Sequence, residues 1–525
     1  MPKTILIIGG GLAGLAAGCY AQMNGYQSEI FERHHLPGGL CTAWERRGYV
    51  FDGCLQYLFG SGSGQPYHQL WQELGAVQAR PMINHTELIR VRDPHGDTLT
   101  VHCDPDRLAA HMKEISPTDA RVIDELCDGI RRFQSFDLSL MQRKPKSLMT
   151  PHDWANMGRA MLPYVAPLAR WGMISARDFA RRCKDPFLRM AIPHMFGWPD
   201  IPMLVGMSLL AYMQNGNAGF PSGGSLAFAR AIEQRYLALG GRIHYRAMVE
   251  RILVEDAPGG GRKAVGVRLY SDEEHRADYV VSAADGRATI FDMLGGEFAG
   301  RALRRRYAGQ LPLHTQVQIS LGVNRDLSAE PHWVTYLLRQ PITIAGEDRH
   351  ELSVKHYSFD PTLAPPGKAV LAAILTTQYR FWQRIYGNKL YDTEQDQVSG
   401  IIIEHLEKLF PGLRNQIEVI DEATPLSYER YTGNWQGSSC GWLLTKQTMP
   451  MMVLGMAKTL PGLRNFYMAG QWVEPGGSVP IVAMSGRNVV QLICHTDGRP
   501  FVTTTPPAAR VTASSAPVEN EVVPL

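Results

Sequence analysis

The residues whose types could do chemistry begin with three glycines close to the N-terminus. Gly9, Gly11 and Gly14 have the spacing G-x-G-x-x-G and follow an apolar run that predicts a buried strand, Thr4–Ile8. A helical pattern that reaches Asn24 comes after them. Glycines at these positions let the backbone approach a pyrophosphate, which the free N–H groups and the dipole of a helix N-terminus then hold. The pattern predicts a dinucleotide cofactor; a glycine-rich bend that only packs a helix on a sheet is the alternative.

An acidic residue and a second glycine turn follow at the spacing that such a cofactor needs. Glu32 ends the second expected strand, Ser28–Glu32, where its carboxylate can accept hydrogen bonds from a ribose. Gly38-Gly39 then forms another tight turn, and a short strand over Tyr49–Asp52 comes after it. Because this backbone can run along an extended cofactor beyond the pyrophosphate, the pattern favours FAD over a nicotinamide cofactor.

The chain builds another glycine turn roughly 460 residues after the first. Gly470, Gly476 and Gly477 follow a short apolar run, and a helix is expected to begin at Val479–Ile481 with Pro480 in its first turn. The N–H groups at that helix end would face the negative charge that a reduced flavin gathers at N1 and O2. One flavin held at both poles therefore explains glycine turns at both chain ends. A terminal strand and helix that only close the sheet are the alternative.

The composition limits the other possibilities. The chain has 525 residues, which favours two domains, and its hydrophobic content of 45% is ordinary for a globular protein. The net charge of +3 is too small to indicate nucleic acid as a partner. The eight cysteines form no C-x-x-C pair, which favours reduced thiols in a cytoplasmic protein and gives no candidate metal site. No run of about 18 apolar residues predicts a transmembrane helix.

The elements that must position the glycine turns come from separate parts of the chain. A second long regular stretch opens with a helix from Ser225 to Leu239 and a strand over Arg242–Tyr245. A small antiparallel meander and an apolar strand that ends before Asp285 complete it. We therefore predict an α/β fold with a discontinuous Rossmann-like FAD-binding domain, made of a parallel sheet and a small antiparallel meander.

The segments in between are expected to form an α+β substrate domain. Strands resume after Leu313 with the mixed polarity that is typical of an antiparallel sheet, and an earlier hairpin is expected over residues 81–100. The predicted domains are residues 1–80, 219–296 and 460–496 for FAD binding, residues 81–218 and 297–459 for the substrate, and residues 497–525 for a disordered tail.

Residues 137–212 predict a helical insertion in the substrate domain, with a basic surface over residues 131–189. The basic stretch, residues 131–189, carries twelve Lys or Arg against four Asp, an excess of eight positive charges, between apolar residues such as Trp154 and Leu162. Basic amphipathic helices bind anionic membrane surfaces, so we expect peripheral contact with a membrane. A solvated basic face over a methionine-rich core is the alternative.

The whole chain up to about Cys494 resembles the phytoene-desaturase, carotenoid-isomerase and retinol-saturase-like flavoproteins, which are related to the amine oxidases in fold. The resemblance rests on the spacing of Glu32 and Gly38-Gly39, and on the motifs IIGGGLAGLAAG, VFDGCLQYLFG, GFPSGGSLAFARAI, RYTGNWQGSSCGW and YMAGQWVEPGGSVPIVAMSGR. The last two motifs are the most discriminating. The chain departs from the family pattern at Leu40, where many members carry a basic residue, and in the GQW of its C-terminal turn.

The resemblance implies FAD held without a covalent link and a long apolar substrate, often a polyene or an isoprenoid. We expect an oxidoreductase that desaturates or saturates C–C bonds by hydride transfer with flavin N5, while the protein orients a C–H bond and excludes water. The alternatives are a redox-neutral isomerase that uses reduced FAD, an amine-oxidase-like flavoenzyme, and a flavin-fold protein that binds a lipid or partner without catalysis. The oligomeric state stays open.

The glycine turns and the resemblance together give the expected site residues. Contacts with FAD are expected from Gly9, Gly11, Leu12, Ala13, Gly14, Glu32, Arg33, Gly38, Gly39, Leu40, Val249, Ala284, Gly470, Gln471, Val479, Pro480 and Ile481. Polar help in catalysis is expected first from Gln56 and Tyr57, which follow the turn after Asp52 toward the flavin. Glu474 is the one acid within the C-terminal turn, where an acid that faces solvent is the simpler interpretation. Asp285 is expected to end a strand near the adenine rather than to act in catalysis.

Overall fold

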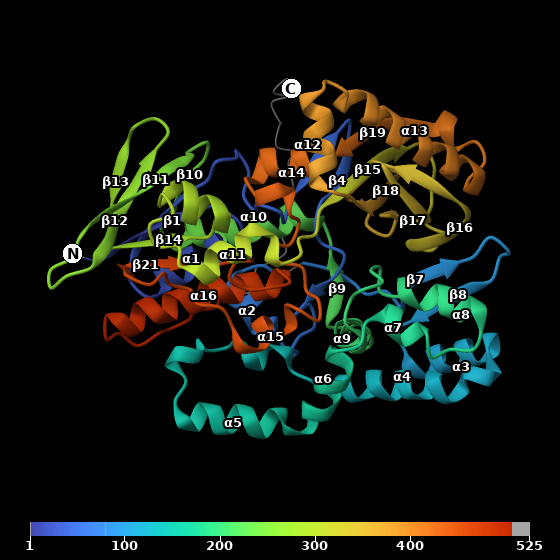
Figure 1. Ribbon diagram of the computed structural model, residues 1–525, viewed down its shortest axis with the longest axis horizontal. Helices are drawn as coiled ribbons and strands as arrows, with labels where there is room; N and C mark the ends of the chain where they lie inside the picture. The colour runs from blue at the N-terminus through green and yellow to red at the C-terminus, as the bar shows by residue number, and fades with distance from the viewer. Residues whose placement is uncertain (1, 79, 507–525) are drawn as a thin grey trace.

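A computed structural model describes residues 2–78 and 80–506 of the protein (Figure 1). Two sheet regions lie beside each other, and the helical segment between residues 105 and 172 runs along the lower edge of the view. The fold is the predicted mixture of a parallel sheet and antiparallel sheets.

The parallel sheet combines strands from three distant parts of the chain. Its spatial order is β10 (Arg242–His244), β2 (Gln27–Phe31), β1 (Thr4–Ile8), β14 (Tyr279–Ser282) and β21 (Phe466–Met468). Every neighbouring pair in it is parallel. In chain order this is the 3-2-1-4-5 arrangement of dinucleotide-binding sheets, whose ligands bind outside the carboxyl ends of the strands where the order reverses. The site is therefore expected beside the ends of β1 and β14.

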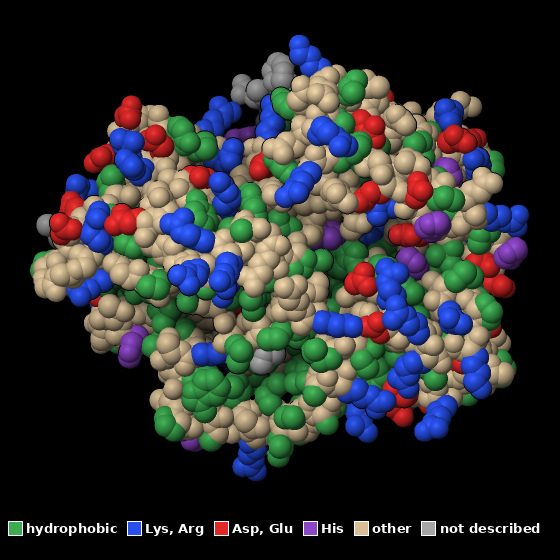
Figure 2. Space-filling view, in the orientation of Figure 1, with side chains coloured by type: hydrophobic (Ala, Val, Ile, Leu, Met, Phe, Trp, Pro, Cys, Tyr) green, Lys and Arg blue, Asp and Glu red, His purple; other side chains and the backbone are tan. Residues whose placement is uncertain are grey.

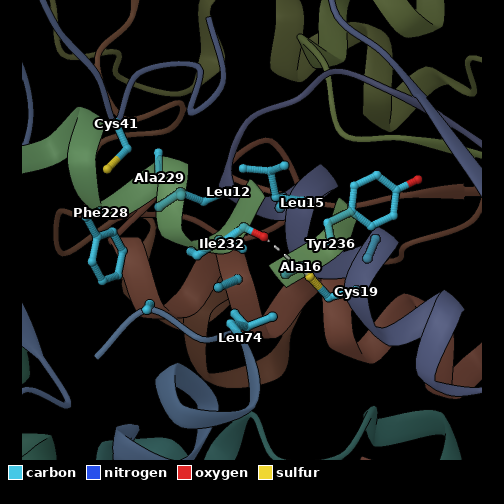
Figure 3. Packing of buried hydrophobic residues seen from close by; sticks show 14 of the residues in the cluster. Leu12, Leu15, Ala16, Cys19, Cys41, Leu74, Phe228, Ala229, Ile232 and Tyr236 are labelled. Carbon is cyan, nitrogen blue, oxygen red and sulfur yellow. Dashed lines mark hydrogen bonds between the residues drawn. The ribbon is translucent and has the colours of Figure 1, made fainter. Parts of the chain in front are cut away.

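Helix α1 (Leu12–Met23) lies against this sheet and is buried from Leu12 to Ala21. Its alanines and glycines allow close approach of α10 (Gly224–Ala238) and α16 (Val479–Thr496). Figure 3 shows α10 packed on α1, where the Cys19 thiol donates to the carbonyl oxygen of Ile232 at 3.8 Å. The helix that opens the cofactor motif is thus fixed by elements from the middle and the end of the chain.

The predicted meander is present as a separate antiparallel sheet. It contains β11 (Val249–Asp256), β12 (Arg262–Leu269) and β13 (Glu274–Arg276), and β20 (Leu463–Arg464) adds to β12 in parallel. Side chains of β11 and β12 share a hydrophobic core with Ile8 and Phe31 of the parallel sheet, so the meander is part of the cofactor region.

A seven-stranded sheet forms the second region. Its order is β19 (Ile417–Ala423), β15 (Gln316–Val323), β18 (Ala369–Thr376), β17 (Glu347–His356), β16 (Trp333–Ile344), β7 (Glu87–Arg92) and β8 (Thr98–His102). All pairs are antiparallel except β16 with β7. The predicted N-terminal hairpin therefore extends the predicted C-terminal sheet, a junction that the sequence did not indicate.

Most helices of the insertion pack around a second core. This core is centred on α9 (Met203–Gln214), whose residues are buried from Leu204 to Met213 except Val205. The others are α3 (Pro105–Ile115), α4 (Ala120–Phe133), α5 (Pro151–Met161), α6 (Val165–Gly172), α7 (Ala176–Ala180) and α8 (Pro186–Ala191). Helix α5 differs from them because none of its residues is buried. Among the described residues, no helix is both long and apolar enough to cross a bilayer.

The remaining elements are short or peripheral. The small sheets pair β3 (Ala43–Arg46) with β4 (Tyr49–Asp52), and β9 (Ala218–Pro221) with β5 (Leu58–Phe59) and β6 (Met82–Ile83). The other helices are α2 (His68–Glu73), α11 (Arg301–Arg305), α12 (Tyr379–Gly387), α13 (Tyr391–Leu409), α14 (Pro425–Thr432) and α15 (Met449–Leu454).

The described start of the predicted tail packs on the cofactor region. The Asp497 carboxylate accepts hydrogen bonds from Tyr26 and Tyr279 at 2.9 and 2.6 Å, and the Val502 N–H donates to the Asn24 side chain at 2.8 Å. The prediction of a disordered tail was therefore wrong for residues 497–506, because their side chains find partners on α1 and the sheet. Its remainder, residues 507–525, lies outside the described residues.

Candidate functional site

The first glycine turn connects β1 to α1 at the carboxyl edge of the parallel sheet. A Cβ on Gly14 would lie 1.9 Å from the carbonyl oxygen of Gly9, so the turn closes only with glycine there. The Leu15 N–H donates to the Gly11 carbonyl at 2.9 Å. Among the described residues, no side chain caps the N-terminus of α1. The first N–H groups of α1 thus point outward for an anionic ligand.

Glu32 lies directly after β2 and next to this turn. One carboxylate oxygen accepts the Gly10 N–H at 2.6 Å and the other accepts the His34 N–H at 2.7 Å. Burial raises the pKa of Glu32, and both hydrogen bonds oppose that rise. A carboxylate has about four acceptor positions, so two are left for the hydroxyl groups of a ribose.

The second turn, Gly38-Gly39, lies on top of the first. The Gly38 N–H donates to the carbonyl oxygen of Gly10 at 2.9 Å. A Cβ on Gly39, whose φ is +61°, would lie 3.2 Å from the Cα of Gly11. Two segments of bare backbone are therefore in contact where an extended cofactor would pass.

The C-terminal glycine turn lies at the same carboxyl edge of the parallel sheet as the first turn. A Cβ on Gly470 would lie 3.3 Å from the Ala13 Cβ, and the Gly470 N–H donates to the Ser485 hydroxyl at 3.1 Å. A Cβ on Gly486 would lie 2.2 Å from the Ala13 carbonyl oxygen, so α16 and α1 touch through their backbones. Because β21 and β1 are parallel, both helices begin at one edge of the sheet. Ser478 is the N-cap residue of α16, and its side chain makes no capping hydrogen bond.

The segment around α14 joins the two glycine turns. The Arg33 guanidinium donates to the carbonyl oxygen of Arg430 at 3.2 Å. A few residues later, the Asn434 side-chain oxygen accepts from the Gln471 amide at 2.9 Å and from the Trp472 indole at 3.2 Å. The two most discriminating motifs of the sequence are thus hydrogen-bonded to each other.

Asp285 follows β14 and Ala284 at this edge. A Cβ on Gly9 would lie 3.3 Å from the Ala284 nitrogen, so Ala284 borders the first turn. The Asp285 carboxylate accepts the Ala288 N–H at 2.7 Å and the Trp435 N–H at 2.8 Å. Burial raises the pKa of Asp285 to about 6. Its oxygens hold backbone, in agreement with the expectation that it terminates a strand.

These residues fit FAD by their chemistry. Two helix ends with unpaired N–H groups suit the pyrophosphate and the flavin ring, Glu32 suits a ribose, and the backbone of Gly11 and Gly39 leaves no side chain in the way. Most predicted contacts lie at this edge. Val249 is buried in the core that the meander shares with the parallel sheet. The contacts of Val249, Leu40 and the other expected residues with FAD remain predictions.

Gln56 and Tyr57 line a cavity of about 30 Å³, room for about two water-sized groups. The Asp52 carboxylate fixes the loop before them: it accepts the Cys54 N–H at 2.9 Å and, at the start of α10, the Ser225 N–H at 2.6 Å. The cavity is also lined by His85, Leu88, Met213, Phe220, His332, Trp333, Lys355, His356, Tyr357 and Phe359.

Glu474 does not face solvent, contrary to the simpler interpretation of the sequence. The residue is 8% exposed, and its carboxylate forms an ion pair with Lys458. Lys458 precedes the last two strands, and no motif in the sequence marked it as a partner of Glu474. Glu474 does not line the cavity that contains Gln56 and Tyr57.

Sequence reasoning missed the polar side chains of this cavity. His85, His332 and Lys355 come from three segments and have no common motif. The only signal was Lys355 itself, a charged residue at the end of a strand between Val354 and His356, which are both buried.

Comparison with known proteins agrees with this geometry. Prolycopene isomerase of Daucus carota is 25% identical to the chain, over 92% of the chain and 78% of that protein. Lycopene-forming phytoene desaturase of Pseudescherichia vulneris is 24% identical, over 94% of the chain and 99% of the desaturase. An oxidoreductase crystal structure from Methanosarcina mazei has a TM-score of 0.57 at 19% identity, with 93% of this chain and 100% of that chain covered.

The family model described as flavin containing amine oxidoreductase matches residues 12–494. The match begins at the first residue of α1 and covers the Gly38-Gly39 turn, the C-terminal turn, the cavity and the segment around α14. The chain therefore belongs to the family of flavin-containing amine oxidoreductases, and it is an FAD-dependent oxidoreductase.

Proposed function

We propose that the protein desaturates or saturates C–C bonds of a lipophilic substrate, a polyene or an isoprenoid. The observation that carries this proposal is the joint position of Gly11 and Gly470, which puts two uncapped helix ends at one edge of the sheet. The loop after Asp52 leads from this edge to a cavity whose described lining contains no Asp or Glu. The sequence relatives include a lycopene-forming phytoene desaturase.

In this proposal the chain's own residues bind, orient and exclude water. Bound FAD supplies hydride transfer at flavin N5. The predicted contacts at Glu32 and at the starts of α1 and α16 hold it. The ring faces of Phe220 and Phe359 give the substrate an apolar wall, and Gln56 with Tyr57 orients it. Burial raises the pKa of Tyr57 to about 12, so its hydroxyl group stays protonated and can donate a hydrogen bond.

The test is an anaerobic reaction of the FAD-loaded protein with candidate polyenes. Oxidised FAD should lose its visible absorbance while the product is two hydrogens lighter, or reduced FAD should regain it while the product is two hydrogens heavier. A product of unchanged mass that forms only with reduced FAD would instead establish a redox-neutral isomerase, which the likeness to prolycopene isomerase keeps as the second candidate.

We also propose that α5 rests on an anionic membrane surface, where a lipophilic substrate would be found. Trp154 is 45% exposed and Leu162, just after α5, is 71% exposed. Figure 2 shows hydrophobic side chains gathered over α5 and the nearby α15, with Lys and Arg side chains beside them. A helix without a buried face and with basic neighbours suits an interface of this kind. In this proposal the protein is cytoplasmic and peripheral.

A further inference from the structure

The cavity that Gln56 and Tyr57 line holds a lysine without a partner. Lys355, at the end of β17, is 8% exposed, and its ammonium nitrogen has no hydrogen-bond partner among the described residues. The nitrogen lies 3.6 Å from the centre of the Trp333 ring. A buried ammonium group with only a ring face beside it lacks the anion that its charge requires.

Other hydrogen-bond donors face the same space. The rings of His85 and His332 are stacked with their centres 3.8 Å apart, and the Nε2 atom of His85 also has no partner. Gln56 and Tyr57 add an amide and a hydroxyl group to the lining. The donors thus come from the loop after β4, from the segment before β7 and from β17.

None of the described residues that line this cavity carries a carboxylate. The carboxylate whose charge bears on Lys355 belongs to Asp52, which does not line the cavity. That carboxylate already accepts hydrogen bonds from Cys54 N–H, Leu55 N–H and both the N–H and the hydroxyl of Ser225. The volume of about 30 Å³ suits two oxygen-sized atoms.

We propose that this cluster binds the carboxylate end of a lipophilic acid, with Lys355 as its counter-ion and His85 as a second donor. The inference deepens the proposed function, on which it rests, by naming a polar end for the substrate. A carboxylate provides both the missing charge and the acceptor oxygens, whereas an alcohol or a hydrocarbon leaves the ammonium unpaired.

Binding should also take up a proton. Burial lowers the pKa of Lys355 well below its ordinary value, so the side chain holds its proton less tightly before the anion arrives. The other titratable groups that face the cavity are His85, His332, His356, Tyr57 and Tyr357. An anion beside the amine restores the charged form, and the proton comes from the buffer.

The experiment compares all-trans-retinoic acid with retinol, retinal and β-carotene on the FAD-loaded protein, by tryptophan fluorescence and by calorimetry in buffers of different ionisation enthalpy. Retinoic acid should bind about tenfold or more tightly than retinol, the effect of a hydrogen bond to a charged group. Lys355→Met should abolish that preference and the proton uptake while retinol affinity stays the same. The exposed Lys184→Met variant should behave as the natural chain.

Lys355→Met should fold normally, because replacing an unpaired buried charge by an apolar side chain of similar size is neutral or stabilising. His85→Ala is a second variant and should weaken only the binding of the acid. Equal affinity for acid and alcohol, or a covalent adduct with retinal that borohydride traps, overturns the inference. If β-carotene still changes the flavin spectrum, the proposed function survives that result; if no polyene binds or reacts, both fail.

Discussion

Asp285 is the buried acid whose titration the structure predicts most directly. Burial raises its pKa from an ordinary 3.8 to about 6, so the folded protein binds a proton more tightly than the unfolded chain. The stability from this group is full below pH ~4 and is lost as the pH rises through about 6, by up to about 3 kcal/mol. We expect Asp285→Asn to remove this fall in unfolding free energy. Chemical denaturation between pH 4 and 7 measures it, and identical pH profiles for both proteins would contradict it.

Glu32 gives a prediction about the cofactor. Replacing it by Gln keeps the side-chain shape but removes the negative charge that ribose hydroxyl groups would donate to. We expect FAD affinity to fall about tenfold or more, as for the loss of hydrogen bonds to a charged group. Fluorescence titration measures the change, and Glu29→Gln, which loses only a surface contact with His244, is the control. An equal loss of FAD affinity in both variants would contradict a specific role of the Glu32 carboxylate in binding the ribose.

At the scale of elements, the contact of α1 with α16 determines where both helices begin. A Cβ on Gly486 would lie 2.2 Å from the carbonyl oxygen of Ala13 and 2.8 Å from the nitrogen of Ala17. Backbone cannot yield as a flexible side chain does, so the two helices must separate. The ends that are proposed to hold FAD would then move apart.

We therefore expect Gly486→Ala to lower the unfolding free energy by about 1–3 kcal/mol and to weaken FAD binding. The matched control is Gly400→Ala in α13, where the new Cβ meets no atom within 4 Å. This control should be neutral or more stable by up to about 1 kcal/mol, because alanine favours helix over glycine. Thermal unfolding with and without FAD measures both. Equal behaviour of the two variants would mean that the helices do not depend on this contact.

Local patterns were sufficient to predict the elements of the cofactor region. The strand Thr4–Ile8 and the helix at Val479 occur at the predicted positions, because glycine spacing and apolar runs act over a few residues. The pairing of β7 with β16 joins residues about 240 positions apart and depends on packing that no short pattern records. The same holds for Lys355 and His85, which line one cavity only because β7 joins the sheet that contains β17.

At the scale of the whole molecule, the proposed contact of α5 with a membrane can be tested. We expect binding to vesicles that contain phosphatidylserine and little binding to phosphatidylcholine alone, because basic side chains accompany the exposed apolar ones. The double variant Trp154→Asp and Leu162→Asp should reduce binding about tenfold or more in co-sedimentation. Tyr270→Asp, at an exposed aromatic residue outside this region, should not reduce it. Equal loss from both changes would exclude α5 as the contact.

The position of β21 at the far end of the chain has a consequence for synthesis. A ribosome adds about 5–20 residues per second, so roughly 20–90 seconds separate the first glycine turn from its counterpart. From the synthesis of β14 until that of β21, β14 has no neighbour on its outer side. In the proposed site, to which both glycine turns contribute, a nascent chain can hold FAD fully only after translation has passed β21 and the start of α16.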